Sequence, residues 1–148
     1  MKRVSSNLLL LDVNVLVALA WPNHQFHEGA TKRLEGSRDR WATCALTQLG
    51  FIRVSSNPAA VSPARAPADA AGLLAAMVRD PLHVYLGTLP QPVAKRSLPT
   101  FGKILGSQQV TDVYLLAVAQ RFGARLLTFD ARLKALPGAE GLVEALVA

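Results

Sequence analysis

Three aspartates stand inside or directly after apolar runs of the sequence, where a carboxylate is unusual. Asp12 follows a run of leucines, Asp112 lies within Val-Thr-Asp-Val-Tyr-Leu-Leu, and Asp130 closes a third apolar run. The remaining acidic residues occupy polar, turn-like or terminal surroundings, which need no functional explanation. Carboxylates can act as general acids or bases and as ligands of hard divalent cations. These three aspartates are therefore the candidates for chemistry.

The elements around these acids predict that they meet at one edge of a sheet. The leucines before Asp12 show no alternation, which is typical of a strand buried on both faces in a parallel sheet. Residues 125–129 are predicted as a second buried strand, which ends at Asp130. Because ligands bind at the carboxyl ends of parallel strands, the two aspartates converge if these strands are neighbours. Asp112 stands near the start of the helix predicted over 107–122, which leads into the second strand and begins at the same edge.

A cluster of three carboxylates requires a compensating charge, because like charges at close range raise one another's pKa. The nearest bases in the sequence do not stand at a spacing that demands an ion pair: Arg121, Arg125 and Arg132. A hard divalent cation resolves the conflict, and ligand sets made of oxygen favour Mg²⁺ or Mn²⁺ over zinc. The substrate expected for such a centre is a phosphodiester. Taken alone, Asp12 would be better explained as a helix N-cap.

The rest of the chain alternates helices with short apolar strands. Helices are expected over 26–36, 45–54, 69–78 and 131–136, and strands over 41–44, 81–86 and, as a closing edge strand, 141–147. This alternation favours an α/β fold with a mostly parallel central sheet and helices on both faces. We find no repeat or domain boundary, so residues 1–148 are interpreted as one domain.

Composition and charge narrow the class of protein. The 148 residues suit one ordinary domain, and 16 Lys and Arg against 10 Asp and Glu give a net charge of +6. This excess favours a polyanionic partner such as RNA, although the basic residues are scattered. Cys44 is the only cysteine, which excludes an internal disulfide and a thiolate cluster for zinc. Residues 1–7 do not lead into a signal peptide, and no apolar run suits a membrane span, so a cytoplasmic protein is expected.

His24 and His27 stand three residues apart near the expected start of a helix. Two histidines at this spacing can bind a metal ion when further ligands complete the set. The surrounding sequence supplies no further ligands. We therefore interpret both histidines as surface or capping residues rather than as a metal site.

Several motifs, taken together, resemble the PIN-domain ribonucleases, and most closely the VapC toxins of bacterial type II toxin–antitoxin pairs. These motifs occupy residues 10–19, 46–58, 109–119 and 126–130, so the resemblance covers nearly the whole chain. It implies a PIN-like domain that acts as an Mg²⁺- or Mn²⁺-dependent endoribonuclease on tRNA, rRNA or mRNA. It also implies a cognate antitoxin, which inserts a C-terminal segment over the acid crevice, and a homodimer formed through the early helices.

The resemblance assigns roles to particular residues. Three match the metal-binding and catalytic acids of the family: Asp12, Asp112 and Asp130. Three others match polar positions that support those acids: Asn14, Thr111 and Thr128. The family commonly carries a fourth acid on its third helix, and Gln48 takes that place here. An amide oxygen can still coordinate a cation but brings no charge.

Two alternatives to a ribonuclease stay open at this point. A catalytically degenerate PIN module would bind RNA or an antitoxin without cutting, with Gln48 as the visible lesion. An aspartate-nucleophile phosphatase would place its nucleophile at Asp12, but such enzymes generally need a second acid two residues on, where this chain has Asn14. For the ribonuclease, attack by water predicts 5′-phosphate and 3′-hydroxyl ends.

Overall fold

A parallel sheet forms the centre of the structure, a computed structural model that describes residues 8–102 and 104–146. Its five strands are β1 (Leu8–Leu11), β2 (Arg40–Cys44), β3 (His83–Leu86), β4 (Arg125–Thr128) and β5 (Val143–Ala145). Their spatial order is β3-β2-β1-β4-β5, and all neighbours are parallel. Strands β1 and β4 are therefore paired, which was the condition for Asp12 and Asp130 to converge.

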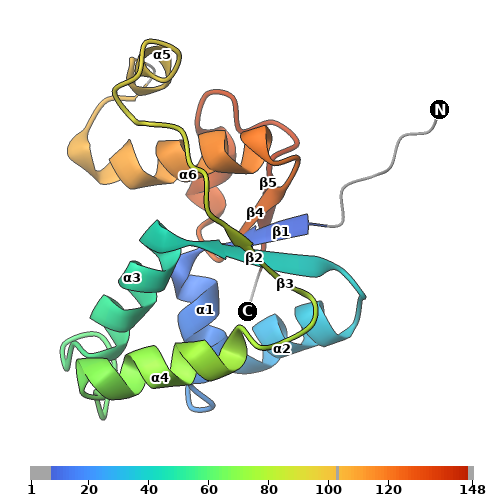
Figure 1. Cartoon of the computed structure of the whole chain (residues 1–148), viewed down its shortest axis with the longest axis vertical. Helices are drawn as coiled ribbons and strands as arrows, with labels where there is room; N and C mark the ends of the chain where they lie inside the picture. Colours follow the sequence, from blue (N-terminus) through green and yellow to red (C-terminus); the bar gives the residue numbers. More distant parts are fainter. Residues whose placement is uncertain (1–7, 103, 147–148) are drawn as a thin grey trace.

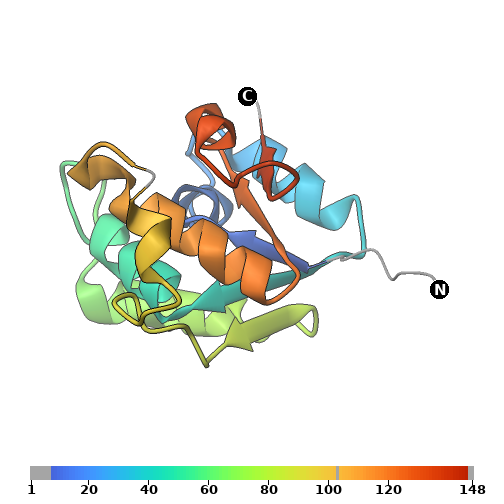
Figure 2. The same ribbon diagram turned by 90° about the horizontal axis from the view of Figure 1, so that it is seen from above.

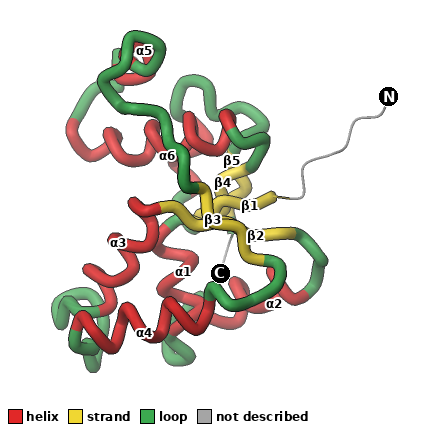
Figure 3. Tube along the Cα trace, viewed as in Figure 1, coloured by secondary structure: helices red, strands yellow, loops and turns green. Residues whose placement is uncertain are grey.

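The helices divide between the two faces of the sheet (Figure 1). One face is covered by α1 (Val13–Ala20), α2 (His27–Glu35), α3 (Ala45–Ser55) and α4 (Pro67–Met77). The other face carries α5 (Leu98–Phe101) and α6 (Val110–Arg121), with the 3₁₀ turns η1 (Ser107–Gln109) and η2 (Ala131–Ala135) beside them in the chain. Figure 2 shows α6 lying across the sheet, and Figure 3 shows the strands between the two helical layers. The predicted α/β class is confirmed.

The apolar run before Asp12 packs on both faces of the sheet, which explains why it does not alternate. Leu10 belongs to the core beneath α6, whereas Leu9 and Leu11 belong to the core beneath α1 to α4. All three side chains are completely buried. A central strand between two helical layers has no solvent face, so both of its faces favour apolar side chains.

The ends of some elements differ from the sequence prediction. Helix α4 begins at Pro67, because proline is favoured in the first turn, where no intrahelical N–H bond is lost. The helix predicted over 131–136 is a 3₁₀ turn. Strand β5 is shorter than the predicted 141–147, and Val147 and the segment 1–7 lie outside the described residues. Within the described ranges, every helix is too short or too polar to be a membrane-spanning segment.

Helices α1 and α3 approach each other closely at Gly50. A Cβ atom on this glycine would lie 2.5 Å from Cγ2 of Val13, the residue that follows Asp12. A valine side chain is stiff, so it cannot easily turn away from the added atom. The glycine therefore allows α3 to dock against the turn that carries Asp12.

We expect Gly50→Ala to lower the free energy of unfolding by about 1–2 kcal/mol in urea denaturation. Alanine gains about 1 kcal/mol of helix propensity, but overpacking typically costs 1–3 kcal/mol and outweighs it. Gly72→Ala in α4 is the matched control, since its added Cβ meets nothing within 4 Å beyond its chain neighbours and the nearby backbone of its own helix, and this variant should be stabilised. Adding Val13→Ala to Gly50→Ala should remove the clash; strictly additive effects of the two substitutions would contradict this packing.

An ion-pair network ties β5 to α2. The Arg33 guanidinium donates hydrogen bonds to both carboxylate oxygens of Glu144, and its Nη2 lies 3.0 Å from Asp39 Oδ2. Arg125 also pairs with Glu144, at 3.2 Å. The hydrogen bonds from Arg33 are the main reason that the pKa of Glu144 lies below its ordinary value, and they outweigh the effect of burial.

This network predicts a loss of stability in acid. Because the folded pKa of Glu144 is depressed, its contribution is complete above the unfolded pKa of about 4.3 and is lost as pH falls through the folded value. Glu144→Gln should cost about 1–2 kcal/mol at pH 7 and less at pH 3, measured by urea unfolding. Glu28→Gln serves as the control. The Glu28 and Lys32 side chains are 84% and 77% exposed, so their ion pair should contribute little to stability. A Glu144→Gln penalty that does not shrink in acid would refute the ionic origin.

Candidate functional site

Asp12 begins the turn between β1 and α1 and is held from both sides. Its Oδ1 accepts a hydrogen bond from the Val13 N–H at 2.8 Å, so it does cap the helix. Its Oδ2 accepts a hydrogen bond from the Thr128 hydroxyl at 2.7 Å. Its own N–H donates to the carbonyl of Leu127 at 2.9 Å, which continues the pairing of β1 with β4. Capping and a place in the site are therefore compatible roles for this carboxylate.

The Thr128 hydroxyl connects the polar groups at this edge of the sheet. Besides donating to Asp12, it accepts from the Asp130 N–H at 3.1 Å and from Asn14 Nδ2 at 3.4 Å. Asn14 Oδ1 in turn accepts from the Phe129 N–H at 3.4 Å. Thr128 is completely buried, so these bonds have little competition from water. The predicted supporting residues Asn14 and Thr128 thus fix the first and last segments of the site relative to each other.

The three predicted acids line one cavity of about 370 Å³. Asp12 comes from the end of β1, Asp130 follows β4, and Asp112 lies in the first turn of α6. Asn14 and His24 also line the cavity, together with an apolar wall made of Val13, Val17, Val54, Ala60 and Val61. An acidic residue in the first turn of a helix, such as Asp112, also interacts favourably with the helix dipole. That interaction alone would not explain why Asp112 lies beside two other carboxylates.

Burial and mutual repulsion set the charges of these acids. Burial is the main reason that the pKa of Asp12 is raised. The negative charge of Asp130 also raises this pKa, whereas the hydrogen bonds from Thr128 and Val13 lower it. The pKa of Asp112 is also raised, by burial first and then by the charges of Asp12 and Asp130. The carboxylates are therefore close enough to repel one another. A bound cation would relieve this repulsion.

Arg132 forms an ion pair that the sequence spacing did not lead us to expect. Its Nε and Nη2 donate to the two carboxylate oxygens of Asp130, each at 2.9 Å, and its backbone N–H donates to Oδ1 at 3.0 Å. The pair forms because Asp130 caps η2, which places residue 132 beside the carboxylate. These hydrogen bonds hold the pKa of Asp130 below its usual value. The Arg132 side chain is 89% exposed, so the pair is open to competition from solvent or a cation.

The donor set fits a hard divalent cation chemically. Oxygen atoms of Asp12, Asp112 and Asp130 share the cavity wall, and Mg²⁺ typically binds one or two carboxylates and keeps several waters. In the part of the chain that the structure describes, however, no three His, Cys, Asp or Glu side chains are gathered closely enough to hold a metal ion as they stand. The acids share a cavity as separate groups, with Asp130 engaged by Arg132.

Two predicted supporting residues lie elsewhere. Gln48 is not among the described residues that line the acid cavity. Its Nε2 donates a hydrogen bond to Thr43 Oγ1 at 3.0 Å. The same Thr43 hydroxyl is hydrogen-bonded to His83 Nε2 at 2.8 Å. On α3 it is Gly50 that faces the turn carrying Asp12. Thr111 lines a separate, mostly apolar cavity of about 300 Å³. Supporting roles for Gln48 and Thr111 stay predictions, which this geometry does not favour.

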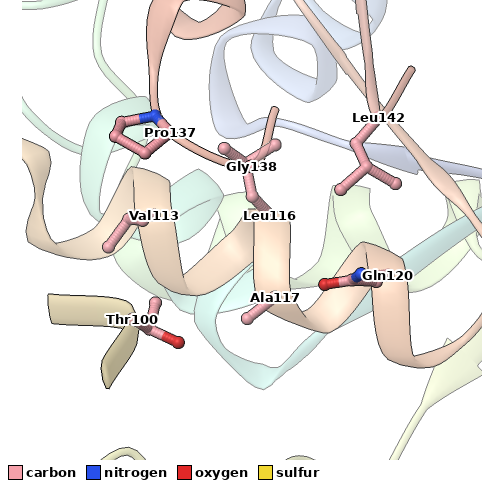
Figure 4. A pocket seen from close by; sticks show the side chains of 8 residues that line it. All are labelled: Thr100, Val113, Leu116, Ala117, Gln120, Pro137, Gly138 and Leu142. Carbon is pink, nitrogen blue, oxygen red and sulfur yellow. The ribbon is translucent and has the colours of Figure 1, made fainter. Parts of the chain in front are cut away.

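A smaller cavity of about 80 Å³ lies between α6, α5 and the chain that leads into β5 (Figure 4). Its wall combines Thr100 with one side of α6 and with Pro137, Gly138 and Leu142. None of the described residues that line it carries a carboxylate. It therefore offers no comparable chemistry.

Comparison with known proteins agrees with this arrangement. A family model described as PIN domain matches residues 9–139. Ribonuclease VapC39 of Mycobacterium tuberculosis is 41% identical over 138 residues, which cover 93% of this chain and 98% of that protein. Ribonuclease VapC38 of the same bacterium is 42% identical over 125 residues, or 84% of this chain and 86% of that protein.

Solved structures show the same fold at low sequence identity. Mycobacterium tuberculosis VapC20, described as a Sarcin-Ricin loop cleaving toxin, superposes with a TM-score of 0.66 at 14% identity, covering 93% of this chain and 98% of that one. A toxin–antitoxin complex from Klebsiella pneumoniae gives a TM-score of 0.62 at 19% identity and covers 93% and 96%. With the acid-lined cavity, the family match and the ribonuclease relatives taken together, this chain belongs to the PIN-domain family, among the VapC ribonucleases.

Proposed function

We propose that this protein is an Mg²⁺- or Mn²⁺-dependent endoribonuclease toxin that hydrolyses RNA phosphodiester bonds. The observation that carries the proposal is the convergence of Asp12, Asp112 and Asp130 on one cavity at the carboxyl edge of the sheet. Relatives named ribonuclease at 41–42% identity support it. The net charge of +6 suits a polyanionic substrate.

Asp12 and Asp112 would hold the cation, with Asp130 as a third ligand once it exchanges Arg132 for the ion. When bound, such a cation activates water and offsets the charge on the leaving oxygen. The Thr128 hydroxyl keeps one oxygen of Asp12 fixed, and the Val13 N–H fixes the other. The carboxylate therefore needs little reorganisation when a ligand arrives.

Asp130 is the proposed acceptor for the proton of the attacking water. The pair with Arg132 keeps the pKa of Asp130 below its ordinary value, so the carboxylate is ionised at neutral pH, and release of Arg132 would make it a stronger proton acceptor. Water forms the new bond to phosphorus, the bond to the 3′-oxygen breaks, and the leaving oxygen takes up a proton. The products are then a 5′-phosphate and a 3′-hydroxyl, with no cyclic phosphate.

A cognate antitoxin is the proposed protein partner, and the cytoplasm, where its RNA substrates occur, is the proposed location. Solved structures with this fold include a toxin–antitoxin complex from Klebsiella pneumoniae and VapBC2 from Rickettsia felis bound to promoter DNA. An antitoxin would cover the acid cavity, whose carboxylates attract a basic side chain. We also propose a homodimer formed through the early helices.

A second candidate is a PIN module that binds RNA or its antitoxin without cutting. The observation in its favour is the pair between Arg132 and Asp130, which occupies both oxygens of one acid. The cleavage experiment separates the two candidates.

The test uses purified protein free of antitoxin, incubated with total tRNA and rRNA in Mg²⁺, Mn²⁺ or EDTA. Discrete cuts that need the metal and leave 5′-phosphate ends would support the ribonuclease. Cyclic 2′,3′-phosphate ends would contradict attack by water. Tight RNA binding by folded, metal-loaded protein without any cutting would favour the binding module.

A further inference from the structure

His24 lines the same cavity as the three aspartates, although it lies in a different part of the chain. The cavity wall continues from Asp12 along one side of α1, through Val13 and Val17, and includes His24 in the loop that follows this helix. The imidazole is therefore available to a ligand that extends from the acids along α1. A polynucleotide is such a ligand, because it continues on both sides of the bond that is cut.

The orientation of the His24 ring is fixed by its neighbours. Its Nδ1 accepts a hydrogen bond from the Phe26 N–H at 3.0 Å. One face is stacked near Phe129, with ring centroids 6.5 Å apart and an interplanar angle of 21°. Phe26 stacks on the same phenylalanine, with centroids 4.6 Å apart. Because Phe129 directly precedes Asp130, this aromatic group also couples the ring to the acid-bearing turn.

The hydrogen bond to Nδ1 determines which nitrogen carries the proton. A nitrogen that accepts cannot also be protonated, so the hydrogen of the neutral ring resides on Nε2. Burial, with a smaller contribution from His27, lowers the pKa of His24, which agrees with a neutral ring. The Nε2–H donor has no protein partner among the described residues, in contrast to Asn14 Nδ2, which lines the same cavity and donates to Thr128.

We propose that His24 is a substrate-contacting residue whose Nε2–H donates a hydrogen bond to a phosphate oxygen of a nucleotide flanking the scissile bond. The proposal rests on the proposed function, since it places RNA in the acid cavity. A neutral donor suits this place, because it binds a phosphate without forming an ion pair with the nearby carboxylates that would compete with the metal. The ring then positions the chain next to the acids rather than taking part in the chemistry.

Three variants separate the donor from the local turn. In His24→Asn, the side-chain oxygen can still accept from the N–H two residues on, as in an Asx turn, but the Nε2 donor is lost. In His24→Gln, the longer amide can place an N–H near the original Nε2. His27→Asn is the control on the neighbouring histidine, which lines a different cavity and bonds the carbonyl of Ala18.

The measurement is kcat and KM for cleavage of a labelled single-stranded RNA, with binding of the same RNA measured by anisotropy in Ca²⁺ to slow hydrolysis. We expect His24→Asn to raise KM and the dissociation constant about tenfold, the effect of one charge-assisted hydrogen bond, with kcat and Mn²⁺ affinity nearly unchanged. His24→Gln should recover most of the loss, and His27→Asn should bind RNA like the parent.

The outcomes distinguish this inference from the proposed function. Cleavage by the parent with an unchanged KM in His24→Asn would overturn the role of His24 and leave the nuclease intact. A parent that binds RNA without cutting, together with weaker binding in His24→Asn, would overturn the nuclease and keep the contact. A lower kcat or lost Mn²⁺ binding in His24→Asn with unchanged RNA binding would overturn the contact in favour of a role at the metal.

Discussion

Replacing Asp12 with asparagine is expected to reduce metal-dependent RNA cleavage by two orders of magnitude or more. The substitution removes a charge from the proposed cation site but keeps a side-chain oxygen that can accept from Thr128 or Val13. The folded pKa of Asp12 is raised, so its ionisation opposes folding as pH rises through that value. The neutral amide should therefore leave the free energy of unfolding unchanged or higher at pH 7.

Three measurements test this expectation: initial cleavage rates, Mn²⁺ binding by calorimetry, and urea unfolding without metal. Asp69→Asn is the matched control, since Asp69 is an exposed acid in the first turn of α4 and should change none of them. Retained cleavage in Asp12→Asn would remove this residue from the catalytic centre. A large loss of stability in Asp12→Asn would instead mean that residue 12 is an aspartate because of its capping hydrogen bond with the Val13 N–H and not because it binds a cation.

Thr128→Val is the second substitution from which we expect a large effect. Valine has nearly the same shape, so the packing against the sheet is kept while the hydroxyl is lost. Asp12 Oδ2 then loses the hydroxyl that donates a hydrogen bond to it at 2.7 Å, and the Asp130 N–H loses its acceptor. We expect a destabilisation of about 2 kcal/mol and a ten- to hundredfold fall in cleavage.

Thr128→Ser provides the control, because it keeps the hydroxyl and removes only a methyl group. Cleavage by the serine variant should stay within a few-fold of the parent, with a modest loss of stability from the small cavity. Equal activity of the valine and serine variants would show that the hydroxyl network does not position the acids. Equal loss of activity in both would assign the effect to packing.

The three acids could be proposed from sequence as site residues because each is a polar exception within an apolar pattern. Asp12 and Asp130 end strands with no solvent face, where a carboxylate would be selected against unless it has a role. Their convergence also depended on the pairing of β1 with β4, which no local pattern determines. The structure supplies that pairing through the register of Leu11 with Leu127.

The contacts that could not be predicted from the sequence depend on the direction in which each side chain points rather than on its residue type. Gln48 has the right chemistry for a ligand, but helical geometry turns it toward Thr43, while Val54 is the residue of α3 that lines the acid cavity. Arg132 pairs with Asp130 because Asp130 caps the turn η2, and that capping role was not assigned to Asp130 from the sequence. His24 was interpreted from the sequence as a surface or capping residue, and its Nε2 donor could be identified only from the structure of the loop.

The hydroxyl bond between Thr128 and Asp12 joins residues that are 116 positions apart. During synthesis on the ribosome, the amino-terminal half therefore emerges with Asp12 alone, and the site is assembled only after β4 has left the exit tunnel and paired with β1. A chain that terminates before residue 112 has the first acid but neither of the other two. If the protein cuts RNA as proposed, this topology postpones the activity until β4 has been made and has paired with β1.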